Sequence, residues 1–164
     1  MAKQTITITL YMSELVFDVQ NKTYLTGRSR TNGENFEQVA NMQADDEEES
    51  SKQILRSIGN AYGSLMAKLS EYVVSDKTTA TNLITDQAAN LTIALQMPGS
   101  YNKAANEAVV AAVHQYIVNT AIADWFVITN KSDAAEYANL AAVNITQLRE
   151  ALNKRVRPAR PAIV

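Results

Sequence analysis

Glycine and proline, the residues that most often interrupt regular structure, are scarce in this sequence. Only five glycines and three prolines occur among its 164 residues. A chain with so little turn punctuation is a poor candidate for many short strands, because most reversals between strands need a turn residue. The sequence therefore predicts a few long elements, chiefly helices.

Length and composition indicate one folded domain. A mass of 18.0 kDa fits a single core, and 46% hydrophobic with 20% charged residues is typical of a chain that folds. We expect one domain over residues 1–157 and an extended arm over residues 158–164. The absence of cysteine excludes disulfides and thiolate chemistry. No apolar run reaches membrane-spanning length and no signal peptide is recognisable, so we expect cytosolic synthesis and no membrane partner.

Two segments alternate with a period of two residues, which is the pattern of a half-buried strand. Residues 5–10 read TITITL, and residues 90–97 read NLTIALQM and stop at Pro98 and Gly99. An isolated strand leaves its backbone donors and acceptors unsatisfied. We therefore predict that the two segments pair in a small sheet that covers the helices.

Four other segments carry apolar residues at helical spacing. They are residues 13–24, residues 45–72, residues 102–128, and the stretch from residue 132 to the C-terminal prolines. The last two are separated by only a few residues and should form an antiparallel hairpin. The apolar segment 121–128 should be buried between partners. The predicted fold is mainly α: a bundle of about four helices, a small two-stranded β-sheet and an extended C-terminal arm.

Residues 27–37 are polar and show no period, which predicts a loop. We place Arg28 and Arg30 on this loop and expect it to be mobile until it contacts a neighbouring subunit. The two arginines could instead hold a phosphate, but the segment lacks the glycine and lysine spacing of a phosphate-binding loop. An interface loop is the preferred interpretation.

The sequence shows no recognisable catalytic or metal motif. His114 is the only histidine, and we expect it to make a surface or interhelical hydrogen bond, with a catalytic triad as the lesser alternative. The acidic run 45–49 is interpreted as a solvated helix start rather than a calcium loop. Asp124, within an apolar stretch, is also given a structural role. We expect no enzymatic activity and no cofactor.

The C-terminus is the most informative charged region. Basic side chains gather there at Arg149, Lys154, Arg155, Arg157 and Arg160, against the single acid Glu150. We expect a proline-stiffened docking arm in which Ile163 and Val164 are apolar anchors, while arginines 155, 157 and 160 pair with acids of a neighbouring subunit. Contact with nucleic-acid phosphates is the alternative.

The two ends of the chain also resemble a known family. Residues 11–30 read YMSELVFDVQNKTYLTGRSR and residues 148–161 read LREALNKRVRPARP. These segments resemble virion structural proteins of tailed phages and prophages of Bacteroides-type bacteria, including crAss-like phages. The resemblance implies a ring or connector protein of the head-to-tail region, a virion location after assembly in the bacterial host cytoplasm, and partners that include further copies, the portal and other ring proteins. DNA would lie nearby.

Overall fold

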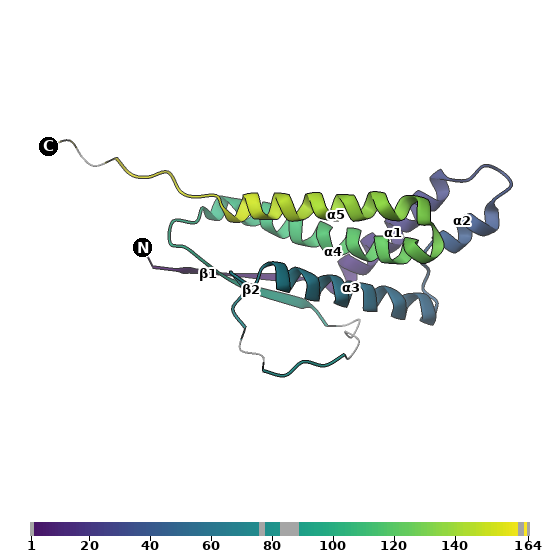
Figure 1. Ribbon diagram of the computed structural model, residues 1–164, viewed down its shortest axis with the longest axis horizontal. Helices are drawn as coiled ribbons and strands as arrows, with labels where there is room; N and C mark the ends of the chain where they lie inside the picture. Colours follow the sequence, from purple (N-terminus) through teal and green to yellow (C-terminus); the bar gives the residue numbers. More distant parts are fainter. Residues whose placement is uncertain (1, 76–77, 83–88, 161–162, 164) are drawn as a thin grey trace.

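The computed structural model describes residues 2–75, 78–82, 89–160 and 163 (Figure 1). Within these residues the chain forms five α-helices and one two-stranded antiparallel sheet. The helices lie side by side in an elongated bundle with the sheet packed against it, and the C-terminal segment leaves the bundle at one end (Figure 1). The mainly helical class with a small sheet is confirmed.

The sheet pairs β1 (Gln4–Leu10) with β2 (Leu91–Met97), as the alternating patterns predicted. Its register runs from Gln4 opposite Met97 to Leu10 opposite Leu91. One face therefore carries the apolar residues of both strands, including the directly opposed and buried Ile8 and Ile93. A short segment adds to the free side of β2: Val74 N–H donates to Ala94 O (2.9 Å), and Gln96 N–H donates to Tyr72 O (2.7 Å).

Helix α4 (Asn106–Thr129) lies at the centre of the bundle. It contacts α1 (Met12–Ser29), α2 (Phe36–Met42), α3 (Glu48–Lys68) and α5 (Lys131–Leu152), and the short 3-10 turn η1 (Lys103–Ala105) leads into it. A helix with neighbours on most sides needs apolar residues on most sides. This explains why the segment lacks a single hydrophobic stripe, although Val127 and Ile128 near its end are exposed.

Helices α4 and α5 form the predicted antiparallel hairpin (Figure 1). Asn130 is the only residue between them and caps both helices. Its N–H donates to Phe126 O, and its own carbonyl accepts from Asp133 N–H. At its other end α5 stops at Leu152, six residues before Pro158, so the expectation that the helix runs to the C-terminal prolines was wrong.

The prediction of a loop over residues 27–37 was wrong at its beginning and its end. Helix α1 continues to Ser29, and α2 begins at Phe36, so that only a short connection separates them. Gly27, which suggested a turn, is a buried helix residue. A Cβ there would meet Val39 O at 3.2 Å, so the glycine permits close approach of α1 and α2.

Helix α2 was missed because seven residues are too few to show a helical period. It is held by tertiary contacts, including the hydrogen bond from Trp125 Nε1 to Met42 O (2.8 Å).

In the part of the chain that the structure describes, no helix has the length and hydropathy needed to cross a membrane.

Candidate functional site

The base of the C-terminal arm is anchored to the segment that precedes α4. Asn102 N–H donates to Lys154 O (3.0 Å), and Val156 N–H donates to Ser100 O (2.8 Å). Arg155 is held at this point because its Nη1 donates to Leu152 O (2.8 Å), which caps the end of α5. The chain therefore leaves the bundle from a fixed point.

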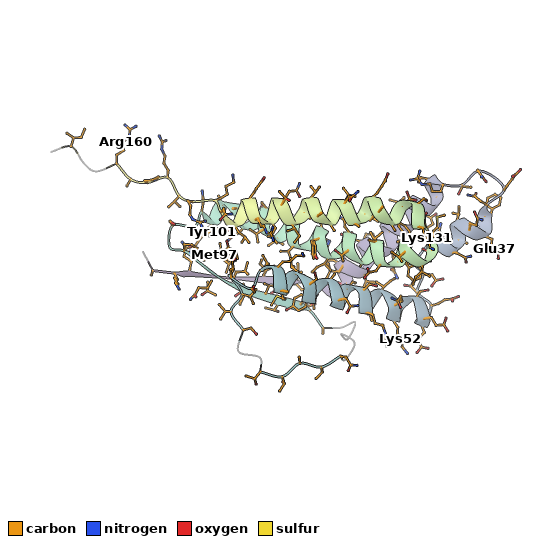
Figure 2. All side chains as sticks on the ribbon, in the orientation of Figure 1. Glu37, Lys52, Met97, Tyr101, Lys131 and Arg160 are labelled. Atoms are coloured by element: carbon orange, nitrogen blue, oxygen red, sulfur yellow. The ribbon has the colours of Figure 1, made fainter. Side chains whose placement is uncertain are left out.

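Beyond this base the described arm extends away from the bundle (Figure 2). Residues 157–160 are all exposed, and Ile163 is 102% exposed. Val164, the other expected anchor, lies outside the described residues. The structure thus presents Arg157, Arg160 and Ile163 to solvent, where another molecule can reach them.

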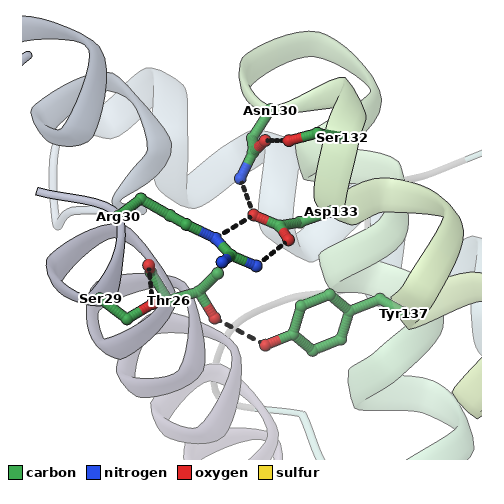
Figure 3. A network of polar contacts seen from close by, with 7 residues as sticks. All are labelled: Thr26, Ser29, Arg30, Asn130, Ser132, Asp133 and Tyr137. Carbon is green, nitrogen blue, oxygen red and sulfur yellow. Dashed lines mark hydrogen bonds and ion pairs between the residues drawn. The ribbon is translucent and has the colours of Figure 1, made fainter.

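The expected interface loop has a different structure. Arg28 is the basic residue of the last turn of α1, and Arg30 is its C-cap. The Arg30 guanidinium binds the Asp133 carboxylate through two hydrogen bonds, Nε to Oδ2 (3.1 Å) and Nη2 to Oδ1 (2.5 Å) (Figure 3). The expectation that nothing in the chain itself holds this segment was therefore wrong.

Asp133 is the centre of this polar network and is only 4% exposed. Asn130 Nδ2 also donates to Oδ2 of Asp133, while Asn130 Oδ1 accepts from the Ser132 hydroxyl (Figure 3). The hydrogen bond and charge of Arg30 lower the pKa of Asp133, against a smaller opposing effect of burial. The network keeps a buried carboxylate ionised at the start of α5, where the helix dipole also favours negative charge.

A second contact from the same region joins α1 to α5. The hydroxyl groups of Thr26 and Tyr137 are 2.7 Å apart (Figure 3). The Tyr137 ring also packs edge-on against Phe126. The sequence contains no local signal for the pairing of Tyr137 with Thr26. Residues separated by 111 positions can be matched only once the helices are packed.

His114 has the interhelical role that was preferred for it. Its Nε2 lies 2.5 Å from Asp18 Oδ2, so the pair joins α4 to α1. Nearby, Lys22 Nζ donates to Gln115 Oε1 (2.8 Å), and burial lowers the pKa of Lys22. Both contacts tie the outer helix α1 to the central helix.

The acidic run 45–49 marks the start of α3, as expected, although the helix itself begins at Glu48. Asp46 Oδ1 accepts from Gln20 Nε2 (2.8 Å), and Glu48 pairs with Lys52 one turn later (2.6 Å). Among the described residues, no three histidine, aspartate or glutamate side chains gather closely enough to hold a metal ion.

Asp124 is exposed on α4, and its carboxylate makes no hydrogen bond or ion pair with any described residue. Partial removal of water by its neighbours raises its pKa.

Comparison with known proteins adds no identification: no protein-family model, curated protein or solved structure matches the chain.

Proposed function

We propose that this chain is a structural subunit of a tailed-phage virion. In this proposal, copies of the chain form a homo-oligomeric ring in the head-to-tail region and join neighbouring components such as the portal or another ring protein. Its activity is then assembly through protein–protein interfaces.

The observation that carries the assembly part of this proposal is the anchored, projecting arm. Its base is hydrogen-bonded to residues 100–102. The described residues beyond this base are exposed to solvent. Proline at position 158 restricts the free segment, which lowers the conformational entropy lost when it binds. A fixed base with a stiff, exposed continuation suits a segment that docks on a neighbouring subunit.

The phage part of the proposal rests on the resemblance of residues 11–30 and 148–161 to virion proteins. The first forms most of α1, and the second forms the end of α5 and the arm base.

A second candidate function is binding of nucleic acid through the same arm. Arg149, Lys154, Arg155, Arg157 and Arg160 are all exposed, so each can reach a phosphate. Phosphate binding would make retention on DNA fall steeply with salt concentration, because each contact releases counterions. Docking through apolar anchors would respond much less to salt.

Deletion of residues 159–164 tests both candidates. If the chain is a ring subunit, the shortened chain should keep the helical circular dichroism spectrum and the unfolding midpoint of the full chain. It should no longer form the ring-sized oligomer, as measured by light scattering after size-exclusion chromatography. Two matched variants then separate the contributions. Ile163→Ser with Val164→Ser removes the apolar anchors, each worth about 1.5–3 kcal/mol when fully buried, and leaves the charges.

The complementary variant, Arg157→Ala with Arg160→Ala, leaves the anchors and removes two positive charges. Loss of oligomers in the anchor variant supports the docking arm. If the shortened chain forms normal oligomers and the arginine variant loses salt-dependent retention on DNA, the ring-subunit hypothesis is wrong. Nucleic-acid binding is then the function that the results support.

A further inference from the structure

Strand β1 forms one edge of the sheet, and in the described part of the chain no strand pairs with its outer side. The other edge of the sheet is closed, because residues 72–74 hydrogen-bond to β2 there. β1 lies at the end of the bundle from which the arm also leaves (Figure 1). The sheet therefore has one open edge, and that edge belongs to β1.

The hydrogen bonds of β2 identify the backbone groups that face this open edge. Val74 N–H donates to Ala94 O, so the backbone groups of Ala94 point away from β1. Thr7 is directly opposite Ala94, so its own N–H and C=O point away from β2. Backbone direction alternates along a strand, and the N–H and C=O of Thr5 and Thr9 therefore point the same way. These outward groups form no hydrogen bond with any described residue.

This edge also lacks the features that protect most edge strands. Natural edge strands usually carry a charge, a proline or a bulge that prevents pairing with another chain. The stretch Gln4–Leu10 contains no charged residue and no proline. Each of its residues is opposite one residue of β2, so the strand has no bulge. Regularly spaced backbone donors and acceptors on an unprotected edge are the binding site of another strand.

The arm of a neighbouring copy matches this edge poorly. Prolines occur at positions 158 and 161, three residues apart, so an extended arm lacks one N–H donor on each of its two sides. The uncharged β1 also offers no acid to the arginines of the arm. A strand without proline and without repelling charge is the better partner.

β1 of a second copy matches every outward group. In an antiparallel pair with a two-fold axis at Thr7, Thr7 is opposite Thr7 of the other copy, and Thr5 is opposite Thr9. Each of these pairs exchanges two hydrogen bonds, so all outward N–H and C=O groups are satisfied, whereas a shifted register leaves some unpaired. Residue i contacts residue j and residue j contacts residue i, as two-fold symmetry requires. Opposed threonines are also favourable cross-strand neighbours.

We propose that β1 pairs with β1 of a second copy of this chain, so that the two sheets join into one continuous antiparallel sheet about a two-fold axis at Thr7. Ile6, which is only partly buried within one chain, then lies beside Ile8 of the other copy. This contact goes beyond the proposed function, since it does not use the arm, and it stands or fails separately.

Cysteine cross-linking of the full chain tests the pairing, because the chain has no cysteine of its own. Thr7→Cys should form a disulfide-linked dimer under mild oxidation, because the axis places the two Cα atoms about 5.5 Å apart. Thr92→Cys is the matched control: it is exposed on the neighbouring strand β2, but the strand spacing alone separates it from its symmetry mate by about 14 Å. Equal cross-linking of the two variants, or a Thr7→Cys chain that stays monomeric at about 100 µM, would overturn the proposal.

A mixture of two further variants tests the register. Thr5→Cys should cross-link to Thr9→Cys in the mixture, because these positions are opposite each other. Either variant alone should cross-link far more slowly, because the same residue of the two copies is then offset by about 14 Å along the strands. If Thr5→Cys cross-links to itself as fast as the mixture does, the strands do not pair in the proposed antiparallel register.

A backbone substitution tests the hydrogen bonds themselves. Thr7→Pro removes the outward N–H and leaves the bonds between β1 and β2, since proline is tolerated where the N–H of an edge strand faces solvent. Thr7→Ala is the control, because it keeps the N–H. Introduced into both chains of the Thr5→Cys and Thr9→Cys mixture, Thr7→Pro should slow cross-linking about tenfold or more, and Thr7→Ala should have little effect. Equal rates in chains with unchanged circular dichroism spectra would contradict the proposal.

Deletion of residues 159–164 separates this contact from the arm. The Thr7→Cys disulfide should form at the same rate in the shortened chain, whereas the ring of the proposed function should be lost. Loss of the cross-link together with the arm would show that the arm, rather than β1, holds the copies together, and the β1 pairing would then be wrong.

Discussion

Substitution of Asp133 by alanine should destabilise the bundle, although no catalytic or binding role is assigned to this residue. Asp133 is 4% exposed and accepts hydrogen bonds from Arg30 and Asn130. Alanine removes the acceptor for both donors and the negative charge from the first turn of α5.

The size of the effect depends on how well water can replace Asp133 as the hydrogen-bond acceptor for each donor. The Arg30 side chain is 51% exposed, so water largely replaces its lost partner and its contribution is small. Asn130 is 7% exposed and cannot be rehydrated in place, which costs about 1–2 kcal/mol. Loss of the favourable interaction with the helix dipole adds about 0.3–1 kcal/mol. We expect a total of about 2 kcal/mol at pH 7, or roughly 4–8 °C in melting temperature.

The same effect should depend on pH in one direction. The folded-state pKa of Asp133 is lowered, so its stabilising contribution is present above the unfolded-state value of about 3.9 and is lost as pH falls through the lower folded-state value. The difference in stability between wild type and Asp133→Ala should therefore be constant from pH 7 to about 5 and shrink below about 4.

Urea unfolding followed by the fluorescence of Trp125, the single tryptophan, measures the difference. Protein concentration is kept low and equal, since assembly adds apparent stability. Glu136→Ala is the matched control, because it removes an exposed acid from the same region of α5 and should change stability by less than about 0.5 kcal/mol. Equal midpoints for the two variants, or a difference that persists unchanged at pH 3, would refute the reasoning.

Two further predictions follow from the same packing. Arg30→Glu should lower the urea unfolding midpoint, because it places a second carboxylate next to the buried carboxylate of Asp133. Arg28→Glu breaks no side-chain contact between described residues and should leave the midpoint unchanged. Equal midpoints for the two variants would favour the original prediction of a mobile loop. Phe126→Ala should cost about 3–5 kcal/mol in urea unfolding, because a fully buried ring leaves a cavity between α4 and α5. The neighbouring Val127→Ala, at a position 56% exposed, should cost far less, and a loss of similar size at both positions would contradict the packing.

Local periodicity was sufficient to predict most of the secondary structure. Both strands alternate over their whole length because one face of the sheet is buried and the other is exposed. The long helices were recognisable because apolar residues recur in each at helical spacing, and the short connection expected between the last two left antiparallel packing as the simplest arrangement. Among the candidate site residues, the exposure of Arg157, Arg160 and Ile163 agrees with an arm, while its docking function remains a prediction.

The segment around Gly27 shows what local patterns could not provide. Glycine, serine and asparagine favour a loop when they are considered alone, yet the chain continues as helix to Ser29. The helix is stabilised there because Gly27 permits contact with α2 and because Arg30 reaches Asp133, which is 103 residues away. The sequence determined which stretches could form helices and strands, since that depends on spacing between near neighbours. Only the tertiary structure decided where α1 ends and which charges are paired, because those energies depend on groups that are distant in sequence.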